Sequence, residues 1–409
     1  MQKSDWKKYK LKDLGQINKS SISKNDKFQT IVYLDTGNML AGQISETVEY
    51  PILKAPSRAR RKVQNNSIVY SMVRPNQLHY GLIRNPQRNF IVSTGFAVFD
   101  CYEDKAYNRF IYYWLTQSYI TELLQSIAEN STSAYPAIRP EDLGNLEINL
   151  PPVEEQKRIA QILGSLDDKI ELLQKQNKTL EDMAKAIFKS WFVDFDVVHA
   201  KQKGLPKADI MREYHLTDEL YDLFPSDFEN SSLGPIPTGW QVKILGDFFP
   251  VKTGKKDANV ASKIGKYPFF SCAQNILRTD EYSFDNTALL LAGNGDFNLK
   301  WYRGKFEAYQ RTYVLIPNHE KDLPFLYYAM QFFLDKITLG SRGSVIKFIT
   351  KGMIENYKLV IPEEHLWKYM SELLGQWTNK IESNLKQIQT LTELRDTLLP
   401  PLISGKIRV

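Results

Sequence analysis

Cysteine is scarce in this 409-residue sequence, which contains only Cys101 and Cys272. Two cysteines this far apart exclude a disulfide framework and a cysteine-based metal site, and we expect both to be buried thiols. The five histidines show no spacing typical of metal ligands. No apolar run is long enough to span a membrane, and the first residues, MQKSDWKKYK, lack the apolar core of a signal peptide. We therefore expect a protein of the cytoplasm with no membrane partner and no metal of its own.

The sequence motifs of common catalytic sites are also missing. The run TGKK at 253–256 lacks the earlier glycine of a phosphate loop. The run GNG at 293–295 is not followed by a predicted helix, which argues against a dinucleotide site. No Asn-Pro-Pro or Asp-Pro-Pro precedes an aromatic residue, as would be expected in an amino-methyltransferase. The run EQK at 155–157 resembles part of a nuclease site, but it falls in the first turn of a predicted helix, where charges usually face solvent or the helix dipole. We expect no catalytic residues here and no cofactor bound by this chain.

Aromatic residues and a mild positive charge are what the composition does offer. The chain contains 22 Tyr, 21 Phe and 7 Trp, which suits β-rich domains as well as base stacking. Its net charge of +6 gives a weak preference for polyanions, and its hydrophobic content of 43% is ordinary for a soluble protein. The length is sufficient for two or three domains with their own cores.

An internal repeat is the strongest pattern in the sequence. Residues 146–187 realign on 357–398 at a constant shift of 211, so that Leu163-Gly164 falls on Leu374-Gly375. Further upstream, Trp6, Leu11 and Asp13 match Trp240, Leu245 and Asp247 at a shift of 234. The run FIYY at 110–113 likewise matches FLYY at 325–328, and we interpret these aromatic residues as core. A tandem of two similar units suits a ligand with its own approximate two-fold symmetry, and duplex DNA is the foremost candidate.

The order of predicted elements is the same in both halves. Residues 1–150 and 240–361 contain short strands and a helical stretch, and each is followed by a segment that contains a long helix, at 151–196 and 362–409. The first helix begins after Pro151-Pro152, and the second is expected to end at Pro400-Pro401. Residues 197–239 read as a linker with one short helix. We expect an α+β fold in which two pseudo-symmetric mixed α/β domains are joined by two long helices.

Both long helices carry an apolar stripe with heptad spacing. In the first helix, apolar residues recur every seven positions, with Ile162 and Met183 filling intermediate positions that Lys169 and Gln176 leave polar. The second stripe also includes Leu385 and Leu394. We call the line along which the two helices would contact each other the seam. The expected seam residues are Ile159, Leu166, Leu173, Leu180, Ile187, Leu374, Trp377, Ile381, Ile388 and Leu391. Single helices of this length are poorly stable alone, so we expect an antiparallel coiled coil; the alternative is that each helix packs only on its own domain.

Positively charged residues gather among Tyr, Asn, Ser and Gly in segments that read as loops. Arginine suits phosphates and guanine edges, and asparagine suits adenine. In the first half the candidates for DNA contact are Arg58, Arg60, Arg61, Lys62, Arg74, Asn76, Tyr80 and Arg84. In the second half they are Lys252, Lys255, Lys256, Lys300, Arg303, Arg311, Arg342 and Lys347. The cluster at 58–62 has no counterpart in the second half, so the two halves are expected to read different DNA.

Four motifs resemble one known family. The runs LPPVEEQKRIA (150–160), AIFKSWFVDFD (186–196), LFPSDFE (223–229) and LGPIPTGW (233–240) look like the specificity subunit of type I restriction–modification systems. The resemblance implies two target recognition domains, each reading half of a bipartite double-stranded DNA site. It also implies that the helices act as a spacer and dock two modification subunits. Those partners would bind S-adenosylmethionine and methylate adenine, and restriction subunits using ATP and Mg²⁺ would translocate and cut DNA.

A second function remains open at the level of the sequence. The helices could serve a coiled-coil interaction or scaffold protein whose globular parts bind other proteins and read no DNA sequence. A stand-alone methyltransferase or nuclease is disfavoured by the missing motifs.

Overall fold

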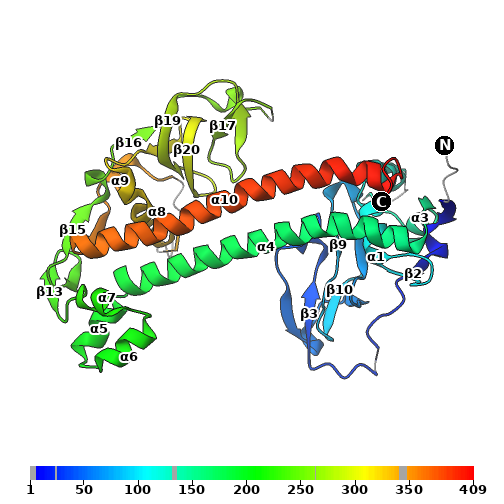
Figure 1. Ribbon diagram of the computed structural model, residues 1–409, viewed down its shortest axis with the longest axis horizontal. Helices are drawn as coiled ribbons and strands as arrows, with labels where there is room; N and C mark the ends of the chain where they lie inside the picture. The colour runs from blue at the N-terminus through cyan, green and yellow to red at the C-terminus, as the bar shows by residue number, and fades with distance from the viewer. Residues whose placement is uncertain (1–5, 24, 131–135, 263, 340–347) are drawn as a thin grey trace. The chain divides into compact units, whose positions relative to one another are not determined.

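The computed structural model of the protein describes all residues except 1–5, 24, 131–135, 263 and 340–347 (Figure 1). The chain forms two compact units, called here unit 1 (residues 1–172 and 387–409) and unit 2 (residues 173–386). Two helices of 40 residues each, α4 (Val153–Phe192) and α10 (Glu364–Ile403), contribute one part to each unit. No helix in the described ranges is long and apolar enough to cross a membrane.

Unit 1 is built on two four-stranded sheets. The first has the order β6 (Val48–Pro51), β3 (Thr30–Leu34), β10 (Phe90–Ser93) and β7 (Ala59–Lys62), in which the β3–β10 pair is parallel. The second is antiparallel and has the order β2 (Gly15–Ile17), β11 (Phe96–Cys101), β8 (Ile68–Ser71) and β9 (Tyr80–Leu82). The hairpin β4 (Met39–Leu40) and β5 (Gln43–Ile44) and the helices α1 (Asn108–Leu115), α2 (Ser118–Glu129) and α3 (Pro140–Gly144) complete the domain. Buried Leu34, Val92 and Phe96 join the two sheets in one cluster.

Unit 2 is built on one six-stranded sheet. Its order is β16 (Val251–Thr253), β21 (Thr312–Leu315), β19 (Phe284–Ala292), β20 (Leu299–Ala308), β17 (Tyr267–Phe270) and β18 (Leu277–Thr279). The helices α8 (Leu323–Leu339) and α9 (Lys351–Glu355) follow the sheet in sequence. Along β19, Leu289 and Leu291 pack in the same cluster as Phe325 of α8, whereas Leu290 between them belongs to a second cluster. This alternation is the period of two that a strand with both faces covered requires.

Residues 197–239 are folded, and the expectation of a linker with one short helix was wrong. They form α5 (Asp196–Gln202), α6 (Lys207–Glu213), α7 (Asp218–Asp222) and the hairpin of β13 (Phe228–Ser231) and β14 (Gly234–Pro237). The physical reason is an aromatic cluster in unit 2, in which Trp191 meets Phe224 at 5.2 Å and Phe192 meets Trp240 at 5.8 Å between ring centroids. Burial of these rings orders a segment whose many polar residues suggested a linker.

The two units share a strand pair in the same register. In unit 1, β1 (Lys7–Lys10) pairs antiparallel with β12 (Glu147–Leu150), with Lys7 opposite Leu150. In unit 2, β15 (Gln241–Ile244) pairs antiparallel with β22 (Lys358–Ile361), with Gln241 opposite Ile361. These partners are related by the shifts of 234 and 211 residues found in the sequence. The expected pseudo-symmetry is confirmed at the level of individual residue pairs.

The repeated glycines show the same symmetry in side-chain packing. A Cβ added to Gly164 of α4 would lie 2.3 Å from the guanidinium carbon of Arg109, and one added to Gly375 of α10 would lie 3.4 Å from Cγ of Pro324. Arg109 and Pro324 directly precede the matching aromatic runs at 110–113 and 325–328. In each unit, therefore, a glycine of the long helix leaves room for the residue that precedes the matching aromatic run. The contact at Gly164 is much closer than the one at Gly375.

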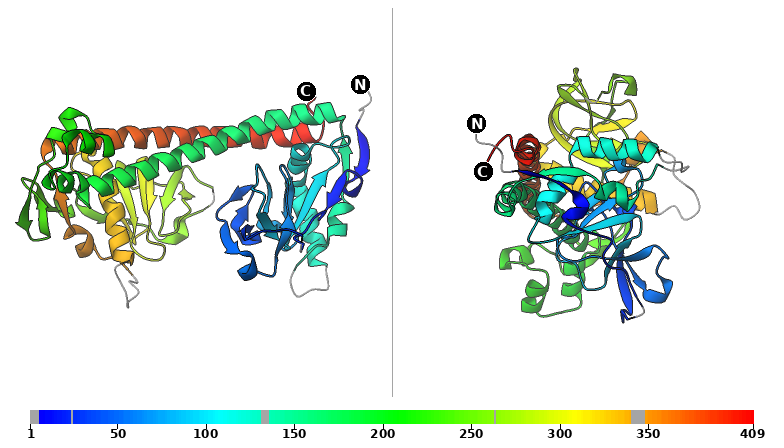
Figure 2. Two further views of the ribbon diagram at one scale, coloured as in Figure 1. Left: turned by 90° about the horizontal axis from the view of Figure 1, so that it is seen from below. Right: turned by 90° about the vertical axis from the view of Figure 1, so that its right-hand side faces the viewer.

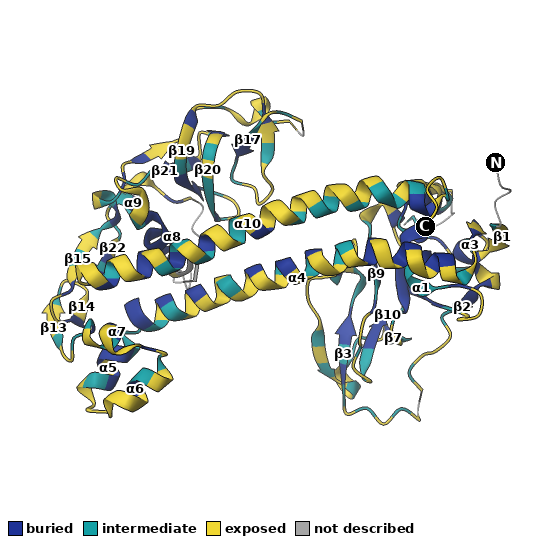
Figure 3. Ribbon diagram, in the orientation of Figure 1, coloured by how far each residue is buried: buried dark blue, intermediate teal, exposed yellow. Residues whose placement is uncertain are grey.

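The two long helices are antiparallel. Within unit 1, Arg395 of α10 binds Asp167 of α4 at 3.0 Å, and Arg408, beyond the end of α10, binds Glu155 at 2.9 Å. From the first pair to the second, the residue number rises at the C-terminal end of the chain and falls in α4, so the two helices run in opposite directions. They lie side by side there (Figure 2). All ten expected seam residues are buried or half-buried in their own unit, and buried and exposed positions alternate along both helices (Figure 3). The coiled-coil arrangement is confirmed.

The intermediate seam positions differ from the expectation by one residue. In α4 they are Leu163, Ile170, Asn177 and Ala184, all buried, so that spacings of four and three alternate. Ile162 and Met183 are instead 37% and 45% exposed. In α10 the expected stripe residues Leu385 and Leu394 are exposed, whereas Asn384 and Arg395 beside them face the seam. At Asn384 and Arg395 the expectation failed because polar residues occupy seam positions next to exposed apolar ones. At Leu163 and Ala184 it failed because the exposed neighbours Ile162 and Met183 are apolar as well.

Each long helix ends in a buried apolar pair. Trp191-Phe192 at the end of α4 belongs to the core of unit 2, and Leu402-Ile403 at the end of α10 belongs to the core of unit 1. The two pairs are 211 residues apart, in keeping with the repeat. Burial of Leu402 and Ile403 also explains why α10 continues to Ile403 and does not end at Pro400-Pro401, as had been expected.

Candidate nucleic-acid interface

The cations at 58–62 lie on and beside a strand rather than in a loop, which corrects the expectation. Residues 59–62 form β7, the last strand of its sheet, where Ala59 is buried and Arg60 is exposed. Lys62 is bound to Asp26 at 2.6 Å, and its hydrogen bond to that carboxylate lowers the pKa of Asp26 to about 2. Arg61 is half-buried, with its Nη1 3.5 Å from Oγ of Ser21, and desolvation lowers its pKa. Arg61 and Lys62 therefore hold the neighbouring chain segment to the sheet, and Arg58 and Arg60 remain exposed.

Tyr80 is not a surface residue, so its assignment as a DNA contact was wrong. Its side chain is 7% exposed, stacks on Tyr70 at 5.5 Å and meets Tyr112 edge-on at 6.4 Å. Burial raises the pKa of the Tyr80 phenol, as expected for an aromatic residue in the core.

Arg84, predicted from the sequence as a DNA contact, binds the long helix α4 in this structure. Its Nη1 lies 2.5 Å from Asp168 and 3.2 Å from Glu171, both on α4. Arg109 reaches the same Asp168 at 2.7 Å. Burial opposes the ionisation of Asp168, but the two guanidinium groups outweigh it and lower its pKa. The neighbouring Asp167 accepts a hydrogen bond from the hydroxyl of Tyr113 at 2.5 Å, in addition to the ion pair with Arg395.

These contacts fasten the first globular domain to both long helices, and sequence reasoning missed them. The two aspartates lie far in sequence from the arginines that reach them, so only the fold brings them together. The one available signal was the adjacent pair of acidic residues, Asp167 and Asp168, beside seam residue Leu166.

Arg74 and Asn76 lie at the short 3-10 helix Pro75–Gln77, and both are exposed. The backbone N–H of Asn76 donates to Oε1 of Gln125 at 3.2 Å, which ties this turn to α2. Arg74 has a positive φ of 47°, a backbone conformation that residues other than glycine adopt infrequently. The turn is thus held in place while the Asn76 side chain remains on the surface.

In unit 2, three of the candidate cations have local partners. Lys256 binds Glu281 at 2.5 Å, and Arg303 binds Glu320 at 3.2 Å. Nζ of Lys300 donates to the carbonyl of Ala273 at 2.8 Å, and burial lowers its pKa. Lys252, Lys255 and Arg311 are exposed, and Arg342 and Lys347 lie outside the described residues. Lys252, Lys255 and Arg311 are therefore the described candidates of unit 2 that are best placed to meet a polyanion.

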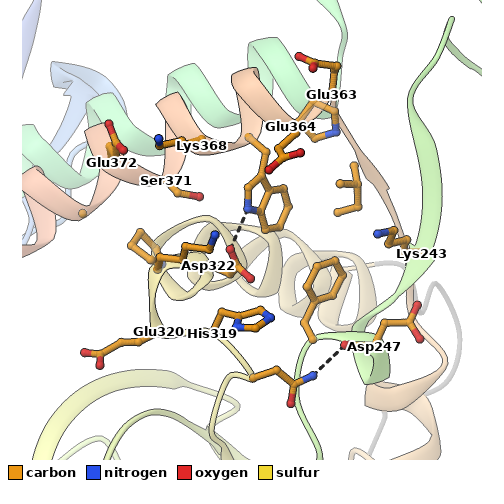
Figure 4. A pocket seen from close by; sticks show the side chains of 18 of the residues that line it. Lys243, Asp247, His319, Glu320, Asp322, Glu363, Glu364, Lys368, Ser371 and Glu372 are labelled. Carbon is orange, nitrogen blue, oxygen red and sulfur yellow. Dashed lines mark hydrogen bonds between the residues drawn. The ribbon is translucent and has the colours of Figure 1, made fainter.

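A hollow of about 1140 Å³ in unit 2 is unsuited to DNA phosphates (Figure 4). Its charged lining consists of Asp247, Glu320, Asp322, Glu363, Glu364 and Glu372 against Lys243, Arg303, Lys321 and Lys368. The indole N–H of Trp367 donates to Asp322 at 2.9 Å inside it, and the amide of Asn318 donates to the carbonyl of Asp247 at 3.0 Å. Its acidic groups outnumber its cations, and a phosphate backbone requires the opposite balance.

Residues 155–157 have structural partners in place of a catalytic arrangement. Glu155 is 8% exposed and binds Arg408, so the expected solvent-facing turn is partly buried. Gln156 is fully buried, accepting from the backbone N–H of Tyr107 at 2.8 Å and donating to the carbonyl of Pro151. Among the described residues, no group of three or more His, Cys, Asp or Glu side chains could hold a metal ion. Cys101 and Cys272 are free and partly rather than fully buried.

Two mixed α/β units of matching register, each with its own set of exposed cations and joined by antiparallel helices, define a duplicated nucleic-acid reader. The family comparison agrees with this class. The chain belongs to the family of the type I restriction modification DNA specificity domain, whose model matches residues 3–182 and 237–393.

Characterised relatives extend over much of the chain. The specificity subunit of the type I restriction enzyme HindI of Haemophilus influenzae is 25% identical and covers 99% of this chain and all of its own length. The EcoDI specificity subunit of Escherichia coli is 39% identical over 43% of this chain and 40% of its own length. The MjaIX specificity subunit of Methanocaldococcus jannaschii is 29% identical over 75% of this chain and 71% of its own length. The crystal structure of the type I restriction–modification S subunit from M. genitalium has the same fold, with a TM-score of 0.60 over 98% of this chain and 97% of that chain, at 17% identity.

Proposed function

We propose that this specificity subunit reads a bipartite site in double-stranded DNA, one half with each globular domain. It docks two modification subunits, which bind S-adenosylmethionine and methylate adenine, and restriction subunits, which use ATP and Mg²⁺ to translocate and cut DNA. The chain itself supplies recognition and scaffolding without catalysis, and it acts on DNA in the cytoplasm.

One observation carries this proposal more than any other. The two units repeat the same strand register, glycine position and helix-end packing, but their exposed cations differ. Unit 1 presents Arg58 just before β7 and Arg60 on β7, whereas unit 2 presents Lys252, Lys255 and Arg311. A common frame with different charged surfaces is what reading two unlike half-sites requires.

The proposal is tested with the chain assembled with its modification subunits. The complex is incubated with a randomised duplex library, and the bound fraction is sequenced; the host genome is mapped for methylated adenine with and without the chain. We expect one motif of two specific halves separated by unspecified base pairs. A complex that assembles but selects no sequence and directs no methylation would favour the scaffold alternative.

A second measurement addresses the cofactors. Equilibrium dialysis with S-adenosylmethionine should show binding to the assembled complex and none to the isolated chain. Stoichiometric binding to the isolated chain would contradict its non-catalytic role.

A further inference from the structure

We propose that Arg58 reads a guanine of the first half-site, and that Asp35 positions its guanidinium group for this contact. The proposal rests on the DNA-reading function above and names one of its specificity-determining residues. Among the cations that the structure describes, Arg58 is the one whose side chain is exposed while its backbone and a nearby carboxylate are both held by hydrogen bonds.

The backbone at Arg58 is held by two hydrogen bonds. Its carbonyl accepts the backbone N–H of Thr94 at 2.8 Å, and Ala59, the next residue, donates to Pro56 at 2.9 Å. Arg58 thus enters β7 from a closed turn and is tied to the loop between β10 and β11. A side chain that leaves the sheet at such a point has a defined direction, which recognition of a base edge requires.

The guanidinium group lies across Gly95. A Cβ added to Gly95 would be 2.8 Å from Nη2 of Arg58 and 2.8 Å from Cγ2 of Thr36. The absence of a side chain at Gly95 therefore leaves the space that the arginine occupies. This contact sets the position of the far end of a long side chain that is otherwise exposed.

The carboxylate of Asp35, the residue before Thr36, is held in place by hydrogen bonds of its own. It accepts the hydroxyl of Tyr33 at 2.9 Å, and Tyr33 is itself 6% exposed. Burial opposes the ionisation of Asp35, but the backbone N–H of Thr36, the hydroxyls of Tyr33 and Ser93 and the charge of Arg58 outweigh it and lower its pKa. The charge of Asp35 therefore attracts the guanidinium group of Arg58, and no hydrogen bond or ion pair between them occupies its donors.

The donors of Arg58 remain available for a ligand. In the described part of the chain, no hydrogen bond or ion pair joins its side chain to another residue. Lys62, Arg84, Lys256 and Arg303 differ in this respect, because each is bound to a carboxylate. An arginine whose guanidinium N–H groups have no partner can donate two hydrogen bonds to O6 and N7 of guanine, the commonest specific contact in the major groove.

The experiment measures base selectivity with the complex of this chain and its modification subunits. Once the bipartite site is known, duplexes carrying each alternative base at every position of the first half-site are compared by competition binding. For Arg58→Ala and Arg58→Lys we expect the preference for guanine to fall about 5- to 100-fold at a single position, with unchanged preferences elsewhere. Asp35→Asn should weaken the preference at the same position to a smaller extent.

Gly95→Ala is the decisive variant because it keeps every charge. Its new methyl group displaces the flexible end of Arg58, so the fold should survive while selectivity falls at the same position. Arg88→Ala, which removes another exposed arginine of unit 1, is the matched control and should leave all preferences unchanged. Thermal unfolding and assembly with the partner subunits are measured for each variant to establish that the fold is intact.

Two results would overturn the proposal. One is an Arg58→Ala complex that keeps all base preferences; the other is an equal loss at every position that follows the salt concentration, which marks a phosphate contact. Failure of the proposed function is a different result, since the unaltered complex would then select no sequence at all.

Discussion

At the scale of single residues, the glycines of the two long helices have unequal tolerance for a side chain. Gly164→Ala would place a methyl group on the guanidinium of Arg109, which also binds Asp168, and we expect it to lower the free energy of unfolding by about 1–3 kcal/mol. Gly375→Ala meets only Pro324 at an ordinary contact distance, and alanine is favoured in helices by about 1 kcal/mol, so this variant should be neutral or stabilising. Urea titration of both variants tests the difference, and equal effects would contradict it.

A second residue-scale prediction concerns Asp26 and pH. The folded pKa of Asp26, about 2, lies below the value of about 3.9 for an unfolded aspartate. Its ion pair with Lys62 therefore stabilises the folded state fully above pH ~4, and this contribution is lost as the pH falls towards 2. We expect the stability of Asp26→Asn to be lower than that of the unaltered chain at pH 6 and to converge with it near pH 2. A constant difference across this range in urea unfolding would exclude the pair as the cause.

At the scale of elements, the seam of the long helices contains a buried polar pair. Nδ2 of Asn384 donates to Oδ1 of Asn177 at 2.7 Å and to Oε1 of Gln176 at 3.0 Å. Asn384 is fully buried, so replacing it alone leaves Asn177 without its donor. We expect Asn384→Leu to destabilise the chain by about 1–3 kcal/mol.

The double variant Asn177→Leu/Asn384→Leu separates pairing from burial. Two leucines in the seam should restore or exceed the original melting temperature, while the register of the helices becomes less uniquely defined. Leu385→Asn, at the exposed neighbouring position, should change stability by less than about 0.5 kcal/mol. Circular dichroism gives the melting temperatures, and hydrogen exchange along α4 and α10 reports the loss of one register; a double variant weaker than the single one would contradict this account.

The elements also show how far the sequence could predict this molecule. The heptad residues from Ile159 to Ile187 were predictable because large apolar side chains repeat there at a fixed interval. Several intermediate positions were not, because Asn177, Asn384 and Arg395 are polar and become visible only through their partners on the other helix. The same limit applied to the candidate DNA contacts: nothing local in the sequence distinguishes Arg84, which binds the distant Asp168, from the exposed Arg58.

At the scale of the whole molecule, we predict that the length of the two helices sets the number of unspecified base pairs between the two half-sites. Deleting one heptad from α4 alone, residues 174–180, shifts its later residues relative to their partners and should destabilise the chain. Deleting residues 380–386 of α10 as well shortens both helices by about 10 Å. We expect this paired deletion to remain folded and to alter the unspecified spacer by about three base pairs, since one base pair rises about 3.4 Å. Methylation mapping gives the spacer directly, and an unchanged spacer would refute the role of the helices in setting it.

Unit 1 combines the two ends of the chain, and this has a consequence for folding during translation. Its core includes Leu402 and Ile403, whereas every buried residue of the main unit 2 core lies between Ala184 and Leu374. On the ribosome, the sequence of unit 2 is therefore available as one uninterrupted stretch before the last residues of unit 1 exist. The globular domain that is translated first is the one completed last. We expect a chain truncated before Leu402 to leave the core of unit 1 incomplete while every residue of the main unit 2 core is already present.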